Sequence, residues 1–65
     1  MSAVIDFYYP AKGIKAVLTK QECLSGDVLY IAELHMGEIV VQLPTIDDPE
    51  AWKNAVEEYI EERYM

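Results

Sequence analysis

The side chains best suited to covalent chemistry are a single cysteine and a single histidine, Cys23 and His35. A cysteine nucleophile is usually activated by a neighbouring imidazole, which a third group holds in place. Here the two residues fall in separate connections between the expected elements, and the sequence offers no evident third group. The simpler interpretation is a small buried thiol and a histidine in a hairpin loop. We therefore expect no catalytic residues and no enzymatic activity.

Clustered acids at Asp47, Asp48 and Glu50 are the candidate metal ligands. Adjacent acids at the start of a helix usually act as caps, and a metal site normally draws on histidine or cysteine at ligand spacing as well. The three glycines are isolated turn residues, so the chain has no glycine-rich phosphate loop. We expect neither a metal nor a cofactor.

The C-terminal segment 48–65 reads DPEAWKNAVEEYIEERYM, and four of the last nine residues are glutamates. Glutamates near the carbonyl end of a helix oppose its dipole by about 0.3–1 kcal/mol each. Two like-charge pairs at i,i+4, Glu57–Glu61 and Glu58–Glu62, add about 0.2–0.5 kcal/mol each. This acidic face, defined by the four glutamates, has two interpretations. It is either a solvated face that maintains solubility, or an anionic surface that imitates phosphates and occupies a basic groove on another protein.

The elements that must position these residues follow from periodicity. Residues 3–9, 14–19, 28–34 and 39–43 have the composition and alternation of strands, and residues 10–13 read as a turn. In residues 3–9, odd positions are expected on one face and even positions on the other. Asp48 and Pro49 suit the start of a helix over 49–64. The expected fold is a single α+β domain over residues 1–65, a two-layer ββββα arrangement with a four-stranded antiparallel sheet and one amphipathic helix on one face.

Two strand segments are apolar on both faces, VLYI at 28–31 and IVV at 39–41. One helix covers only one face of a sheet, so the other face is expected to meet either a second copy of the chain or a different partner. The expected oligomer-interface residues are Tyr30, Ile31 and Val40.

Charge and composition limit the classes of partner. The chain has 65 residues, 52% of them hydrophobic, and a net charge of −7, which repels nucleic acid and anionic membranes. No segment reaches the roughly 20 apolar residues of a membrane span, and the start MSAVIDFYY has no basic region typical of a signal peptide. A lone cysteine favours a reducing compartment, so we expect a cytoplasmic protein.

Two functional hypotheses remain. The first is a non-enzymatic acidic interaction protein that mimics nucleic-acid phosphates and blocks a basic nucleic-acid-binding protein or complex. Its expected partner-binding residues are Glu57, Glu58, Glu61, Glu62, Tyr64, Asp47 and Asp48. This small, acidic profile is similar to that of phage-encoded inhibitors of host nucleic-acid enzymes, an analogy of class alone. The alternative is a small homo-oligomeric regulatory or structural module, such as an antitoxin-like subunit, in which the acidic helix serves only solubility.

Overall fold

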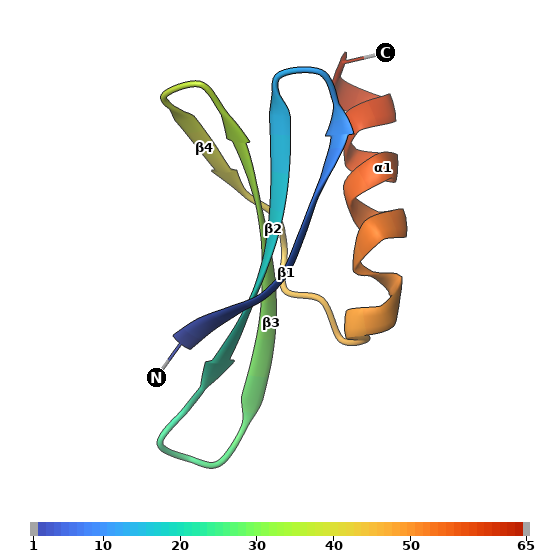
Figure 1. Ribbon diagram of the computed structural model, residues 1–65. Coiled ribbons are helices and arrows are strands. Elements are labelled where there is room, and N and C mark those ends of the chain that lie inside the picture. The colour runs from blue at the N-terminus through green and yellow to red at the C-terminus, as the bar shows by residue number, and fades with distance from the viewer. Residues whose placement is uncertain (1, 65) are drawn as a thin grey trace.

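The computed structural model describes the backbone of residues 2–64 and the side chains of residues 2–63. The elements are β1 (Ser2–Ala11), β2 (Ile14–Glu22), β3 (Val28–Met36), β4 (Ile39–Gln42), a short 3-10 turn η1 (Pro49–Ala51) and α1 (Trp52–Tyr64). The strands form one antiparallel sheet in the order β1-β2-β3-β4, and α1 lies against one face of it (Figure 1). The predicted small α+β fold, a four-stranded antiparallel sheet with one C-terminal helix, is confirmed.

The first hairpin is tighter than the sequence predicts. The expected turn over 10–13 shrinks to Lys12 and Gly13, where Gly13 has a φ of 81°. Pro10 lies within β1, at a shift in the register between Tyr8 and Ala11. A proline has no N–H to donate, and it is tolerated here because β1 is an edge strand.

The second hairpin is also tighter, and it moves His35 from a loop into a strand. β3 continues to Met36, and only Gly37 and Glu38 connect it to β4. Gly37 has a φ of 64°, which a two-residue hairpin turn with glycine in first position requires. The expectation that His35 lies in the hairpin loop is therefore wrong, since His35 pairs with Lys15 and Val40 within the sheet.

The core lies between α1 and the face of the sheet that it covers, here called the inner face. Strand register places Leu18 opposite Ala32 and Leu34 opposite Ala16, so that each large side chain is beside a small one. This alternation leaves room for the apolar stripe of the helix. The buried residues of this core are Ala16, Leu18, Ala32, Leu34, Leu43, Trp52, Val56 and Ile60.

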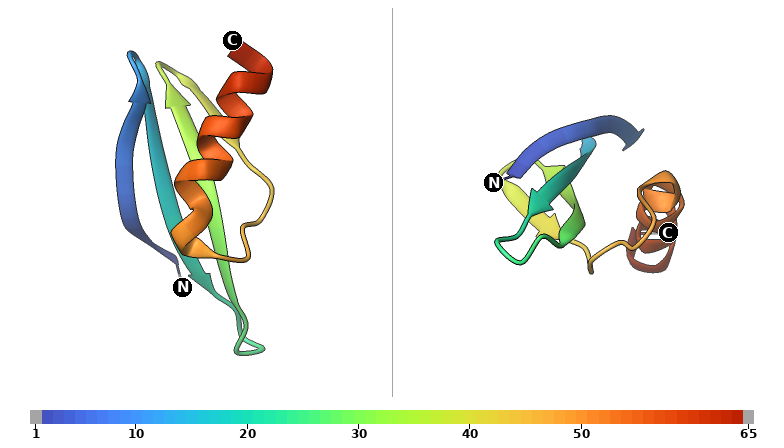
Figure 2. Two further views of the ribbon diagram at one scale, coloured as in Figure 1. Left: turned by 90° about the vertical axis from the view of Figure 1, so that its right-hand side faces the viewer. Right: turned by 90° about the horizontal axis from the view of Figure 1, so that it is seen from below.

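The opposite, outer face of the sheet carries no helix, as Figure 1 and the right view of Figure 2 show. Ile31 and Val40 lie on it, since they pair with Thr19 and His35 and alternate with core residues. Tyr30 does not. It packs against the core, so its assignment to the outer face is wrong. Consecutive strand residues point to opposite faces, and Tyr30 and Ile31 cannot share one.

A bulge in β1 changes which residues reach the outer face. The register skips Ile5 between Val4 and Asp6. As a result Val4 and Phe7, expected on opposite faces, both lie on the outer face, where they pair with Thr19 and Val17.

Candidate functional site: an acidic groove beside the helix

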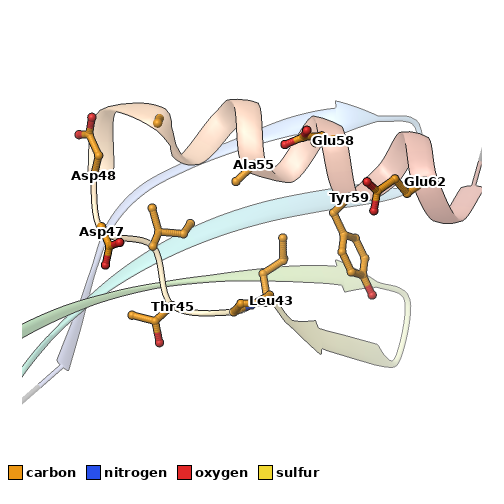
Figure 3. A pocket seen from close by; sticks show the side chains of 11 residues that line it. Leu43, Thr45, Asp47, Asp48, Ala55, Glu58, Tyr59 and Glu62 are labelled. Atoms are coloured by element: carbon orange, nitrogen blue, oxygen red, sulfur yellow. The ribbon is translucent and has the colours of Figure 1, made fainter.

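A groove of about 410 Å³ separates one flank of α1 from the linker, residues 43–48, that connects β4 to η1 (Figure 3). In Figure 3, Ala55 and Tyr59 extend from α1 and Leu43 extends from the linker into the same space. Among the described residues, the lining consists of Leu43, Pro44, Thr45, Ile46, Asp47, Asp48, Ala51, Ala55, Glu58, Tyr59 and Glu62. The floor is therefore mainly apolar and the rim carries four carboxylates.

Backbone bonds and a helix cap hold the linker in position. The Leu43 N–H donates to Ala32 O at 2.9 Å, and the Ile46 N–H donates to Tyr30 O at 2.9 Å, so the linker stays beside β3. At its end Asp48 Oδ1 accepts from the Glu50 N–H at 3.0 Å, which caps the turn that leads into α1. The predicted capping role of Asp48 is confirmed, and Asp47 is left exposed on the rim.

The structure divides the acidic face into two rows. Glu58 and Glu62 line the groove together with Asp47 and Asp48, and we call these four residues the groove row. Glu57 and Glu61, here called the hairpin row, line a smaller cavity of about 190 Å³ with Pro10, Ala11 and Ile60. Neighbouring helix positions diverge by about 100°, so Glu57 and Glu58 point to different flanks. The structure therefore places four of the expected partner-binding residues at one groove and two at another site.

No ion pair neutralises either row among the described side chains. The ion pairs there are Lys20–Glu22 at 3.9 Å and His35–Glu33 at 3.8 Å, both on the sheet. The two cations of α1 face aromatic rings instead. Lys53 Nζ lies 5.1 Å from the centre of the Tyr8 ring, and the Arg63 guanidinium lies 5.1 Å from the centre of the Tyr59 ring. The glutamates of α1 are all exposed.

A polar and aromatic cluster fixes the beginning of α1 to β1. The Trp52 indole N–H donates to Asp6 Oδ2 at 3.3 Å, and the Tyr8 hydroxyl donates to Lys53 O at 3.3 Å. The Tyr8 and Trp52 rings meet edge to face at 5.2 Å. Burial, and secondarily the negative charge of Glu57, raises the pKa of the Tyr8 hydroxyl above its usual value of 10.0. These contacts hold the helix, and with it both acidic rows, in a fixed orientation.

Cys23 and His35 lie toward opposite ends of the β2–β3 pair. Cys23 is half-buried in the β2–β3 connection, where its N–H donates to Asp27 O at 2.8 Å. That connection follows the Glu22–Val28 pair, whereas His35 pairs with Lys15 toward the other end of the same two strands. The strand rise separates them by about 20 Å. Within residues 2–64, no three His, Cys, Asp or Glu side chains are arranged to hold a metal ion.

Sequence reasoning missed the floor of the groove. Leu43, Ile46 and Tyr59 form the floor. The sequence pattern that could have indicated it is the pair of apolar residues on either side of Pro44 and Thr45, between the last strand and the helix. For Tyr64, the backbone belongs to α1 and the side chain lies outside the described part, so its anchoring role remains a prediction.

No protein-family model, no curated protein and no solved structure matches the chain. Across the described residues, no helix is long and apolar enough to cross a membrane.

Proposed function

We propose that this protein is a non-enzymatic, cytoplasmic interaction protein that binds a basic nucleic-acid-binding protein or complex and blocks it. In this function the carboxylates of α1 imitate phosphates, as in phage-type inhibitors. The observation that supports the proposal is the set of four exposed helical glutamates without an ion pair among the described residues. A net charge of −7 further favours a cationic partner and disfavours direct binding of nucleic acid.

The mechanism is competition for the partner's basic surface. Long-range attraction by both acidic rows raises the rate of encounter, and apolar contacts near the rows slow dissociation. Asp47 and Asp48 extend the charge beyond the helix, and Tyr64 is the proposed anchor at its end. The contacts of Asp6 and Tyr8 with α1 support this mechanism, because they connect the first turn of the helix that carries the glutamates to β1 before the partner arrives.

The test is capture of the partner from host-cell lysate by tagged protein, at low salt and again at about 0.5 M salt, where screening shortens the range of charge attraction. We expect one basic nucleic-acid-binding protein or complex that is lost at high salt, and that the charge-reversed variant Glu58→Lys/Glu62→Lys does not capture. The captured protein should then release labelled nucleic acid when the wild-type protein is added. Capture by the charge-reversed variant at low salt would refute phosphate mimicry.

The outer face supports a second candidate function, the homo-oligomeric module. Val4, Phe7 and Val40 are 61%, 54% and 51% exposed on this face, which is a large apolar exposure for an isolated domain. A dimer through this face leaves both helices outward, so it is compatible with the first proposal. Sedimentation of the wild-type protein tests it. A monomer at millimolar concentration would count against a module built on the outer face.

A further inference from the structure

We propose that the groove beside α1 binds a segment of the partner in which an apolar side chain stands next to an arginine or lysine. This inference rests on the proposed function, and it deepens it by naming the chemistry of the contact. Acidic charge alone would make both rows equivalent, whereas the groove distinguishes them.

The floor of the groove provides the apolar part of the site. Leu43, which is 6% exposed, forms it together with Ile46 and Tyr59, and Ala55 lies beside them on α1. The volume of about 410 Å³ falls in the usual range of binding pockets. An apolar side chain of a partner can therefore lie against Ala55 and Tyr59 in this groove.

The rim provides the charge that selects the occupant. Asp47 and Asp48 stand at one end of the groove, and Glu58 and Glu62 stand toward the other (Figure 3). No lysine or arginine is among the lining residues. An anionic ligand or a second acidic surface would be repelled, whereas a long cationic side chain can lay its aliphatic stem on the floor and place its charged end at the rim.

The hairpin row differs in the surface beside it. The cavity next to Glu57 and Glu61 is less than half as large, about 190 Å³ against about 410 Å³, and among the described side chains Pro10, Ala11 and Ile60 accompany the two acids. Pro10 also limits how closely a peptide backbone can add to this edge, since it offers no N–H. Among the described side chains, the two rows thus carry equal helical charge with unequal apolar surface, and the hairpin row serves as the matched control.

Two synthetic peptides of equal positive charge test the proposal, one that alternates arginine with leucine and one that alternates arginine with glycine. Amide shifts of isotope-labelled protein are followed during titration. We expect the arginine–leucine peptide to shift residues 43–48 and 55–62 and to bind about tenfold more tightly than the arginine–glycine peptide. Equal binding of the two peptides, or no shift with either at millimolar concentration, would overturn the proposal.

Variants separate charge from shape. Ala55→Phe fills the groove without a change of charge, and we expect it to weaken the arginine–leucine peptide about tenfold. Glu58→Gln/Glu62→Gln should weaken it similarly, and Glu57→Gln/Glu61→Gln by less than about threefold. Circular dichroism and thermal unfolding verify the fold of each variant. If Ala55→Phe does not fold, the two double glutamine variants test the proposal. An equal loss of affinity for the arginine–leucine peptide in both of them would overturn it.

The outcomes distinguish the groove from the proposed function. Peptide binding in the groove without capture of a nucleic-acid-binding protein would refute the function and leave the groove established. Salt-sensitive capture with equal effects of the two rows would leave the function and refute the groove. Self-association that Ala55→Phe abolishes would identify a second copy as the occupant and would refute a separate cationic partner.

Discussion

Replacing Glu62 with lysine should stabilise the fold and weaken binding at the same time. Glu62 lies in the last turn of α1, four residues after Glu58, on the rim of the groove. A residue that serves only solubility should show the first effect without the second. The substitution therefore separates the two interpretations of the acidic face.

The expected gain in stability has three parts. Removing the repulsion between Glu58 and Glu62 contributes about 0.2–0.5 kcal/mol, and the attraction of the introduced lysine to Glu58 contributes about the same. Near the carbonyl end of the helix, removal of the negative charge and introduction of the positive charge each add about 0.3–1 kcal/mol. Both side chains are exposed and screened by salt, so we take the low end of each range, which gives about 1 kcal/mol. For a domain of this size that raises Tm by about 4–8 °C.

Thermal unfolding at low and at high salt measures the gain, and partner or peptide titration measures binding. The gain should shrink at about 1 M salt, where the Debye length falls to about 3 Å. Glu61→Lys is the matched control, since it relieves the Glu57–Glu61 pair in the same turn but lies on the hairpin row. Both variants should be stabilised to a similar degree, and Glu62→Lys should lose more binding. A fall in Tm for both variants would refute the electrostatic reasoning, and full binding by Glu62→Lys would refute the function of the groove row.

Three further predictions concern the core, the Tyr8 hydroxyl and the outer face. Val56 is 0% exposed, so Val56→Ala should lower the free energy of unfolding by about 2 kcal/mol in urea titration, and a loss below about 0.5 kcal/mol would mean that the helix is not packed as described. The pKa of Tyr8 is raised by folding, so the unfolded chain ionises first and stability should fall as pH rises above about 10. Tyr8→Phe should reduce this fall in stability, measured as the urea midpoint at several pH values above about 10. An identical fall in the variant would exclude Tyr8 as its source. Val40→Lys, on the outer face, should change stability by less than about 0.5 kcal/mol and convert any dimer to a monomer in sedimentation. An unchanged dimer would exclude the outer face as the interface.

The elements were predictable because each segment carries its own periodicity. Trp52, Val56 and Ile60 recur at helical spacing and are all buried, as the stripe predicts. The ends of the strands were less predictable, because they depend on neighbours. Pro10 reads as a turn residue in sequence, and only its position on the edge of the sheet allows it to stay in β1.

The faces of the strands were not predictable where both sides are apolar. Tyr30 and Ile31 are equally suited to a core, and the choice between them depends on which side α1 occupies. In β1 the bulge at Ile5 shifts the alternation by one residue, and no local signal marks it. The groove has the same origin, since it exists only because the linker is bonded to Tyr30 and Ala32 of β3.

The orientation of the helix cations fits the proposed binding surface. Solubility requires net charge, and it is satisfied equally well whether or not lysine and arginine pair with glutamate. On α1 the lysine and the arginine rest on the rings of Tyr8 and Tyr59, and the glutamates beside them form no ion pair among the described residues. Arg63 in particular lies over a ring that also lines the groove, so it packs against the site without closing its acidic rim. A binding surface for a cationic partner needs this separation, because each internal ion pair would have to break before the partner could bind.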